Sequence, residues 1–139
     1  MNVQEIMTTT LEAVAPDSTV MEAAMMMDKH DVGCLAVMDG GEVVGAVTDR
    51  DIVIRTVALG KDPRSTATSE IMTSNPVFCR TDDDVETAAH RMMEQKIRRL
   101  IVQDANGTPV GLVSLGDIAA RAHQDELAGE VVEDVCSCP

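Results

Sequence analysis

Two short segments of the sequence place a hydroxyl and a carboxylate at a spacing that suits a phosphorylated sugar. Thr48 precedes Asp51 by three residues, and Ser114 precedes Asp117 by the same interval, each time after a Gly-x-Val stretch. Where a strand passes into a helix, a hydroxyl and the first backbone N–H groups can bind an anion. A carboxylate in the first helical turn can accept hydrogen bonds from two neighbouring sugar hydroxyls. These residue types therefore indicate phosphate recognition beside ribose recognition.

The same pattern also fits an ordinary helix cap. Ser or Thr followed three residues later by an acidic residue satisfies the amides of a helix start without any ligand. For either segment alone, the cap is the stronger interpretation. Two occurrences at equivalent points of a repeated sequence favour a binding site instead.

The elements that carry these segments occur twice in the chain. The segment Ile6-Met7-Thr8 returns as Ile71-Met72-Thr73, 65 positions later, and the interval then becomes 66, so that Asp51 corresponds to Asp117. The change of interval falls in a turn, at residues 104–107, where one inserted residue is tolerated. The sequence therefore contains an internal duplication.

Each copy predicts a helix, a hairpin of two strands and a second helix. In the first copy the apolar residues Val20, Ala23, Ala24 and Met27 form one helical stripe. Strands at 34–38 and 42–48, a turn at 40–41 and a helix from about 49 to 59 follow; in the second copy the strands are 100–103 and 109–114 and the helix runs from 115 to about 124. One hairpin with two helices cannot bury its apolar faces alone, whereas two copies can. The expected fold class is α+β, with two repeats packed in pseudo-two-fold symmetry.

The expected organisation has four parts. The first repeat covers residues 1–60, a polar linker covers 61–69, the second repeat covers 70–124, and a C-terminal tail covers 125–139. The linker assignment depends on the polar, Pro63-containing sequence KDPRSTATS.

Composition excludes several functional classes. The 139 residues carry a net charge of −13, and Phe78 is the single aromatic residue. Phosphate-backbone binding and attraction to anionic membranes need a basic surface, and single-strand stacking needs aromatic rings. We therefore expect neither nucleic acid nor membrane as a partner. With no apolar run near the ~18 residues of a membrane span and no signal-peptide pattern at its N-terminus, the chain is expected to be cytoplasmic.

These segments resemble a tandem pair of CBS domains, the arrangement called a Bateman module. The resemblance is carried by HDVGCLAVMDGGEVVGAVTDRDI at 30–52, QKIRRLIVQDANGTPVGLVSLGDI at 95–118 and the two Ile-Met-Thr segments. It implies repeats of β-α-β-β-α type and a cleft between them that binds AMP, ADP, ATP, NAD or S-adenosylmethionine. It also implies a regulatory homodimer without catalytic residues, acting on a separate protein that the sequence does not name.

The resemblance also assigns roles to individual residues. It places Asp51 and Asp117 at ribose hydroxyls and Thr48 and Ser114 near phosphate. The remaining candidate binding residues lie on or beside the strand ends: Val32, Gly33, Arg50 and Leu100.

The two copies differ in charge before the first hairpin strand. Four cations gather in the second copy within nine residues: Arg91, Lys96, Arg98 and Arg99. In related adenylate-binding modules, a basic residue at the position of Arg99 reaches the phosphate, and the position of Arg98 is a second basic one, whereas the first copy has Gly33 and Cys34 there. Because guanidinium is planar and permanently charged, we predict that the Ser114/Asp117 site accepts phosphate. The alternative is that these arginines form a solvated rim paired with carboxylates.

The cysteines support a second interpretation. Cys136 and Cys138, one residue apart at the C-terminal end, are weak candidates for a soft-metal site. Cys34 and Cys79 fall in predicted strands and are expected to be buried. The alternative function is a ligand-free dimerisation module, or an interaction module that responds to thiol chemistry or metal.

Overall fold

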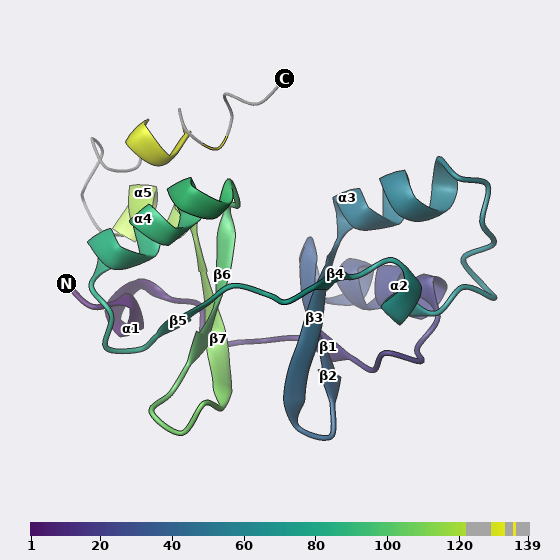
Figure 1. Cartoon of the computed structure of the whole chain (residues 1–139), viewed down its shortest axis with the longest axis horizontal. Coiled ribbons are helices and arrows are strands. Elements are labelled where there is room, and N and C mark those ends of the chain that lie inside the picture. Colours follow the sequence, from purple (N-terminus) through teal and green to yellow (C-terminus); the bar gives the residue numbers. More distant parts are fainter. Residues whose placement is uncertain (122–128, 133–134, 136–139) are drawn as a thin grey trace. The chain divides into compact units, whose positions relative to one another are not determined.

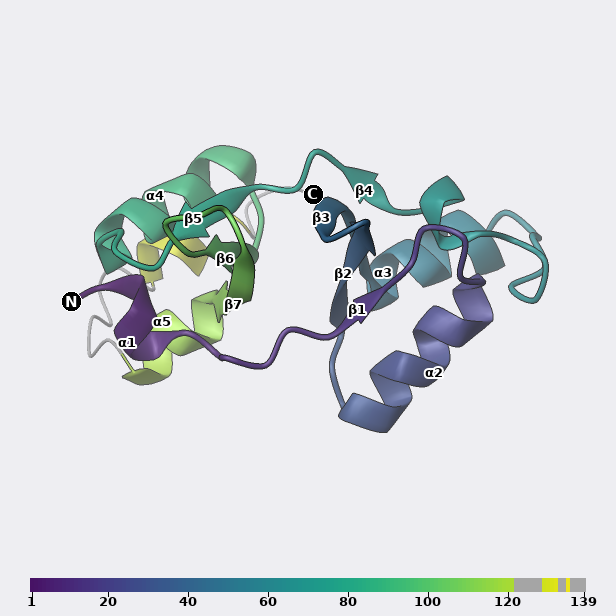
Figure 2. The same cartoon turned by 90° about the horizontal axis from the view of Figure 1, so that it is seen from below.

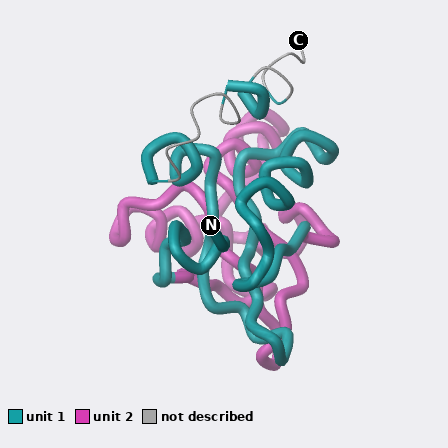
Figure 3. The backbone as a smooth tube through the Cα atoms, turned by 90° about the vertical axis from the view of Figure 1, so that its left-hand side faces the viewer, with its two compact units in different colours: residues 1–10, 77–139 teal, residues 11–76 magenta. Residues whose placement is uncertain are grey.

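The structure, a computed structural model, describes residues 1–121, 129–132 and 135. It contains two compact units, unit 1 formed by residues 1–10 with 77–139 and unit 2 formed by residues 11–76 (Figure 3). Each unit is a small sheet with helices on one face (Figure 1). The expected α+β fold class is thereby confirmed.

Unit 2 is built mainly from the first sequence copy. Its elements are β1 (Ala13–Val14), α2 (Val20–His30), β2 (Cys34–Asp39), β3 (Glu42–Thr48), α3 (Asp49–Ile52), the π-helical η1 (Val53–Val57), the 3-10 helix η2 (Thr68–Glu70) and β4 (Thr73–Ser74). The sheet order is β1-β2-β3-β4, with β1 parallel to β2 and the other pairs antiparallel. As the apolar stripe predicted, α2 buries Val20, Ala23 and Met27.

Unit 1 is built mainly from the second copy. Its elements are α1 (Val3–Ile6), β5 (Phe78–Arg80), α4 (Val85–Gln95), β6 (Arg99–Gln103), β7 (Pro109–Ser114) and α5 (Leu115–Arg121). The sheet order is β5-β6-β7, with β5 parallel to β6 and β6 antiparallel to β7. In the turned view, α1 lies beside α5 (Figure 2). The core of this unit joins α1 to α4, the sheet and α5.

The duplication reaches into details of the backbone. The helices α2 and α4 both end on a residue in the left-handed region, Asp31 with φ 52° and Lys96 with φ 53°. The hairpin register shifts after Val37 in one unit and after Val102 in the other. All these pairs lie 65 positions apart, so each copy has the same local structure.

The compact units divide the chain at other points than the expected repeat boundaries. Thr8 exchanges two backbone hydrogen bonds with Leu112 of β7 (2.8 and 3.0 Å), so the N-terminal segment belongs to unit 1. In unit 2 the segment around Thr73 pairs in the same way with β3. Each Ile-Met-Thr segment therefore contacts the hairpin of the other sequence copy.

Two further expectations differ from the structure. The helix expected over 49–59 is α-helical only to Ile52 and continues as the π-helical turn η1. The expected linker 61–69 contributes to the interior of unit 2, because Thr66 and Thr68 are buried and the Thr68 hydroxyl donates to the carbonyl of Ser18 (2.8 Å). The polar composition of residues 61–69 suggested an exposed linker and did not indicate these internal hydrogen bonds.

Candidate functional site

The junction between β7 and α5 holds Ser114 and Asp117 in a reciprocal cap. The Asp117 amide donates to Ser114 Oγ (3.1 Å), while the Ser114 amide and hydroxyl both donate to Asp117 Oδ2 (2.8 and 3.0 Å). The junction between β3 and α3 repeats this arrangement. There Asp51 N donates to Thr48 Oγ1 (3.2 Å) and Thr48 N donates to Asp51 Oδ2 (3.0 Å). The cap interpretation is therefore correct as local structure in both copies.

The cap occupies only one oxygen of each carboxylate. The second oxygen, Oδ1, lies 3.9 Å from Arg55 Nε at Asp51 and 3.9 Å from Arg121 Nη1 at Asp117. Both distances are longer than a direct hydrogen bond. Each aspartate is thus oriented by the helix start and retains an oxygen that can accept a hydrogen bond from a sugar hydroxyl.

Arg55 and Arg121 lie beside the candidate carboxylates, although neither is among the residues predicted from the sequence. Arg121 Nη1 donates to the carbonyl of Ile6 (3.1 Å), and Arg55 Nη1 donates to the carbonyls of Ile71 and Met72 (both 3.2 Å). Each arginine therefore connects a candidate carboxylate to an Ile-Met-Thr segment. The sequence could have indicated both arginines, because Arg55 and Arg121 lie 66 positions apart. Each also follows its aspartate by four residues, about one helical turn.

The expectation of free backbone amides at the strand-to-helix junction is largely wrong. The Leu115 amide donates to the carbonyl of Arg98 (2.9 Å), and the amides of Ser114 and Asp117 are used by the cap. Backbone N–H groups at a helix start are satisfied by nearby acceptors wherever the chain supplies them. Phosphate recognition at this point therefore depends on side chains.

A pocket of about 410 Å³ opens beside this junction in unit 1, and we call it the Ser114 pocket. Its lining residues are Arg98, Arg99, Ser114, Leu115, Gly116, Ala119 and Val132. Three of the predicted site residues, both arginines and Ser114, are thus brought to one cavity. Among the described residues, Leu100 and Asp117 do not line it: Leu100 is buried in the unit 1 core, and Asp117 contacts the pocket through Ser114.

The equivalent place in unit 2 has the opposite charge. Gly33 stands where the second copy has Arg98, and a Cβ built on Gly33 would lie 3.2 Å from Asp49 Oδ2. The Asp49 carboxylate also accepts from the Arg50 amide (2.9 Å). In the second copy Leu115 replaces Asp49, and its side chain has no oxygen. The first-copy site therefore has Asp49 in addition to Asp51, whereas the second copy has Asp117 together with the two guanidinium groups of Arg98 and Arg99.

The remaining first-copy candidates contribute little to a pocket wall. Val32 is half-buried and packs against the apolar core of unit 2, while the Arg50 side chain is exposed. Neither residue brings fixed positive charge against Asp49 and Asp51.

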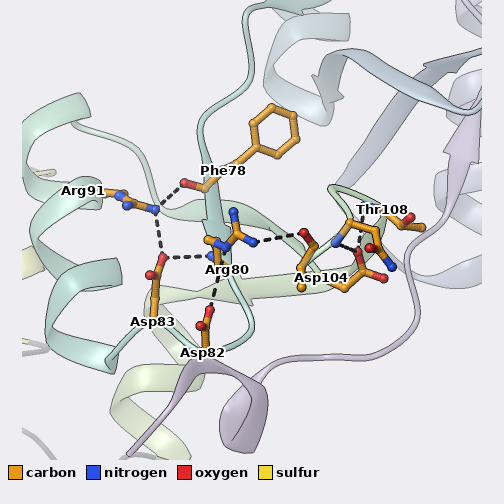
Figure 4. Close-up of polar contacts among 9 residues, drawn as sticks. Phe78, Arg80, Asp82, Asp83, Arg91, Asp104 and Thr108 are labelled. Carbon is orange, nitrogen blue, oxygen red and sulfur yellow. Dashed lines mark hydrogen bonds and ion pairs between the residues drawn. The ribbon is translucent and has the colours of Figure 1, made fainter.

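Arg91, counted with the basic group of the second copy, has a structural role instead. Its Nη1 donates to the carbonyl of Phe78 (2.8 Å) and to Asp83 Oδ2 (3.0 Å), and Asp83 also accepts from the Arg80 amide (2.8 Å) (Figure 4). These bonds connect α4 to β5. The sequence showed the clustering of cations but not the direction of each side chain.

The two described cysteines lie inside the two units, one in each. Cys34 and Cys79 are both buried, and burial together with the nearby Asp83 carboxylate raises the pKa of Cys79 to about 12. Since the thiolate is the nucleophile and metal ligand, Cys79 stays protonated at neutral pH. No group of three or more His, Cys, Asp or Glu suited to a metal occurs within the part of the chain that the structure describes. Cys136 and Cys138 lie outside that part.

None of the helices in the described ranges is long and apolar enough to cross a membrane.

Comparison with known proteins gives consistent relatives over nearly the whole chain. The family model described as "CBS domain" matches residues 3–56 and again 68–123. The CBS domain-containing protein YhcV of Bacillus subtilis is 38% identical over 134 residues, which cover 96% of this chain and 94% of the relative.

Solved structures agree with this result. A CBS domain protein from Pyrobaculum aerophilum, complexed with AMP, is 28% identical with a TM-score of 0.82, covering 93% of this chain and 99% of the other. Hypoxic Response Protein I, with two coordinated zinc ions, is 30% identical (TM-score 0.77; 87% and 98% covered). A hexameric CBS-CP12 protein from bloom-forming cyanobacteria is 30% identical (TM-score 0.82; 91% and 73% covered).

Proposed function

The chain belongs to the CBS domain family and contains two such domains in tandem, and from this premise we propose that it is a non-catalytic sensor of an adenine nucleotide. The proposed site is the Ser114 pocket, and AMP is the first ligand to test. The observation that carries the proposal is the convergence of Arg98, Arg99 and Ser114 on one cavity.

The chemistry of the pocket suits a nucleotide. Two guanidinium groups can bind a phosphate through charge-assisted hydrogen bonds. Apolar wall residues such as Leu115 and Ala119 offer a surface for the base. A volume of about 410 Å³ lies within the range of roughly 300–1,000 Å³ typical of small-molecule sites. The AMP-bound relative from Pyrobaculum aerophilum supports this choice of ligand class. The placement of the ligand between the two repeats stays a prediction.

The ribose role predicted for Asp117, which borders the Ser114 pocket through its hydrogen bond with Ser114, gives the test of this proposal. Replacing Asp117 by Asn keeps an oxygen for the Ser114 amide but removes the charge that would bind two sugar hydroxyls. Because hydrogen bonds to charged groups contribute about 1.5–3 kcal/mol, we expect AMP binding to weaken by about tenfold or more. Isothermal titration calorimetry of AMP against both proteins measures the change.

The first copy supplies a matched control. Asp51→Asn makes the same chemical change in the same cap, at a junction that has Gly33 and Cys34 at the positions of Arg98 and Arg99. We expect this variant to bind AMP as the wild type does. Equal AMP affinity of the wild type and Asp117→Asn would show that Asp117 does not contact the ligand. A loss of affinity restricted to Asp51→Asn would show that AMP binds at the first-copy junction and not at the Ser114 pocket.

We also propose that the protein self-associates as a homodimer through an apolar surface of unit 2. The apolar side chains along η1 and the turn after it are each 48–66% exposed: Val53, Ile54, Val57 and Leu59. Exposed apolar groups of this kind mark protein contacts, and the hexameric cyanobacterial relative supports self-association.

The Val57→Asp/Leu59→Asp double variant is expected to shift the mass in sedimentation equilibrium from dimer to monomer, whereas Lys61→Asp is not. A dimer that persists in the double variant would exclude this surface.

A second candidate function follows from the zinc-containing relative. It would make the chain a metal-responsive interaction module that uses Cys136 and Cys138, in a cytoplasmic setting where thiols stay reduced. Zinc binding that raises the melting temperature while AMP has no effect would favour this function. An effect of AMP alone would favour the nucleotide sensor, whose regulated protein is then a separate chain.

A further inference from the structure

The C-terminal segment contributes a residue to the Ser114 pocket. Residues 129–132 are helical, and Val132 lines the pocket together with Arg98 and Ser114. We propose that Val132 is part of the ligand site, where it forms the apolar wall against the base, and that ligand binding is coupled to docking of this segment. The inference rests on the proposed nucleotide function and adds a determinant of affinity that lies outside the repeats.

Two neighbouring valines hold the segment in place. Val131 is fully buried and Val135 is 9% exposed, and both belong to the apolar core of unit 1. Both side chains therefore anchor the segment to the core of unit 1. The next residue along a helix points about 100° away, which turns Val132 out of the core. This geometry explains why Val132 is 43% exposed and lines the pocket instead of filling the core.

The chemistry of Val132 selects which part of a ligand it would contact. An isopropyl group offers no hydrogen bond to phosphate, and the pocket already provides Arg98 and Arg99 for that purpose. The face of an adenine ring is apolar and gains from covering an exposed aliphatic side chain. Val132 therefore contacts the base, and a ligand that lacks the base loses this contact.

Coupling between ligand and segment follows from the shared wall. A ligand that contacts Val132 binds more tightly when the segment is docked, and by reciprocity the bound ligand favours the docked segment. The fraction of molecules in which residues 129–132 are docked thereby depends on ligand binding.

The first measurement is calorimetric titration of AMP against full-length variants. Val132→Ala is expected to weaken binding about threefold through lost apolar contact, and Val132→Asp about tenfold or more through a carboxylate beside the nucleotide. Glu130→Gln, an exposed position in the same segment, is the matched control and should bind as the wild type does. Because Val132 is exposed, its substitution should leave the melting temperature without AMP nearly unchanged.

The second measurement is amide hydrogen exchange of residues 129–132 with and without AMP. Saturating AMP should slow exchange in the wild type and have no effect in Arg98→Ala/Arg99→Ala. Wild-type affinity in both Val132 variants, with exchange unaffected by AMP, would overturn the inference and leave the proposed function intact. A wild type that binds neither AMP nor ATP would overturn both.

Discussion

Replacing Arg98 and Arg99 together by alanine should weaken AMP binding by about hundredfold or more. Both side chains line the Ser114 pocket, and each charge-assisted hydrogen bond to a phosphate contributes about 1.5–3 kcal/mol, where 1.4 kcal/mol corresponds to a factor of ten. Binding of adenosine, which has no phosphate, should change little. Calorimetric titration of both ligands against the double variant measures this difference.

A control for net charge is needed, because the chain is already acidic at −13. Lys61→Ala/Arg64→Ala removes two positive charges from exposed positions in unit 2 and changes net charge by the same amount. This control should bind AMP almost normally, since neither Lys61 nor Arg64 lines the Ser114 pocket. If the control and the Arg98/Arg99 variant lose equal affinity, the arginines act only as general charge and not as ligands.

Gly111→Ala should cause the largest loss of stability among single small substitutions. A Cβ at this position would overlap the backbone carbonyl oxygen of Thr8, which accepts the Leu112 amide where the N-terminal segment meets β7. Because backbone cannot move aside as a flexible side chain can, we expect a loss of about 2–3 kcal/mol in the free energy of unfolding. Urea denaturation followed by circular dichroism measures this change.

Two other glycines provide the comparison. A Cβ at Gly129 would meet nothing within 4 Å, so Gly129→Ala should be neutral or slightly stabilising. At Gly45 a Cβ would lie 2.5 Å from Met72 Sδ and 2.9 Å from the Thr73 carbonyl, so the alanine variant should fall between the other two. If Gly111→Ala unfolded with the same free energy as Gly129→Ala, the contact between the N-terminal segment and β7 would be refuted.

The sequence predicted the parts of the fold that depend on local pattern. The stripe that begins at Val20 predicted α2, and a short apolar run followed by a glycine turn predicted β2 and β3. The pairing of Thr8 with Leu112 links residues more than a hundred positions apart, and nothing in the local pattern of either segment specifies it. The change from α-helix to π-helix after Ile52 was also not predictable from the spacing of apolar residues, because a segment of five residues is too short to distinguish the two helix types.

The candidate site was predictable where residue type alone determines chemistry. Arg98, Arg99 and Ser114 meet at one pocket because the hairpin of β6 and β7 places the start of one strand beside the end of the other, as the Arg99–Ser114 pairing shows. The sequence counted Arg91 with this basic cluster but gave no direction for its side chain, since its partner Asp83 is set by the turn before α4. The contribution of Val132 depends on how the C-terminal segment docks, and no motif in the sequence marks that contact.

The most direct test is a crystal structure of the full-length protein grown with AMP. The account predicts AMP in the Ser114 pocket, with its phosphate hydrogen-bonded to Arg98 and Arg99 and its base against Val132. AMP bound only at the first-copy junction beside Asp49, or a Ser114 pocket that stays empty at saturating AMP, would contradict it.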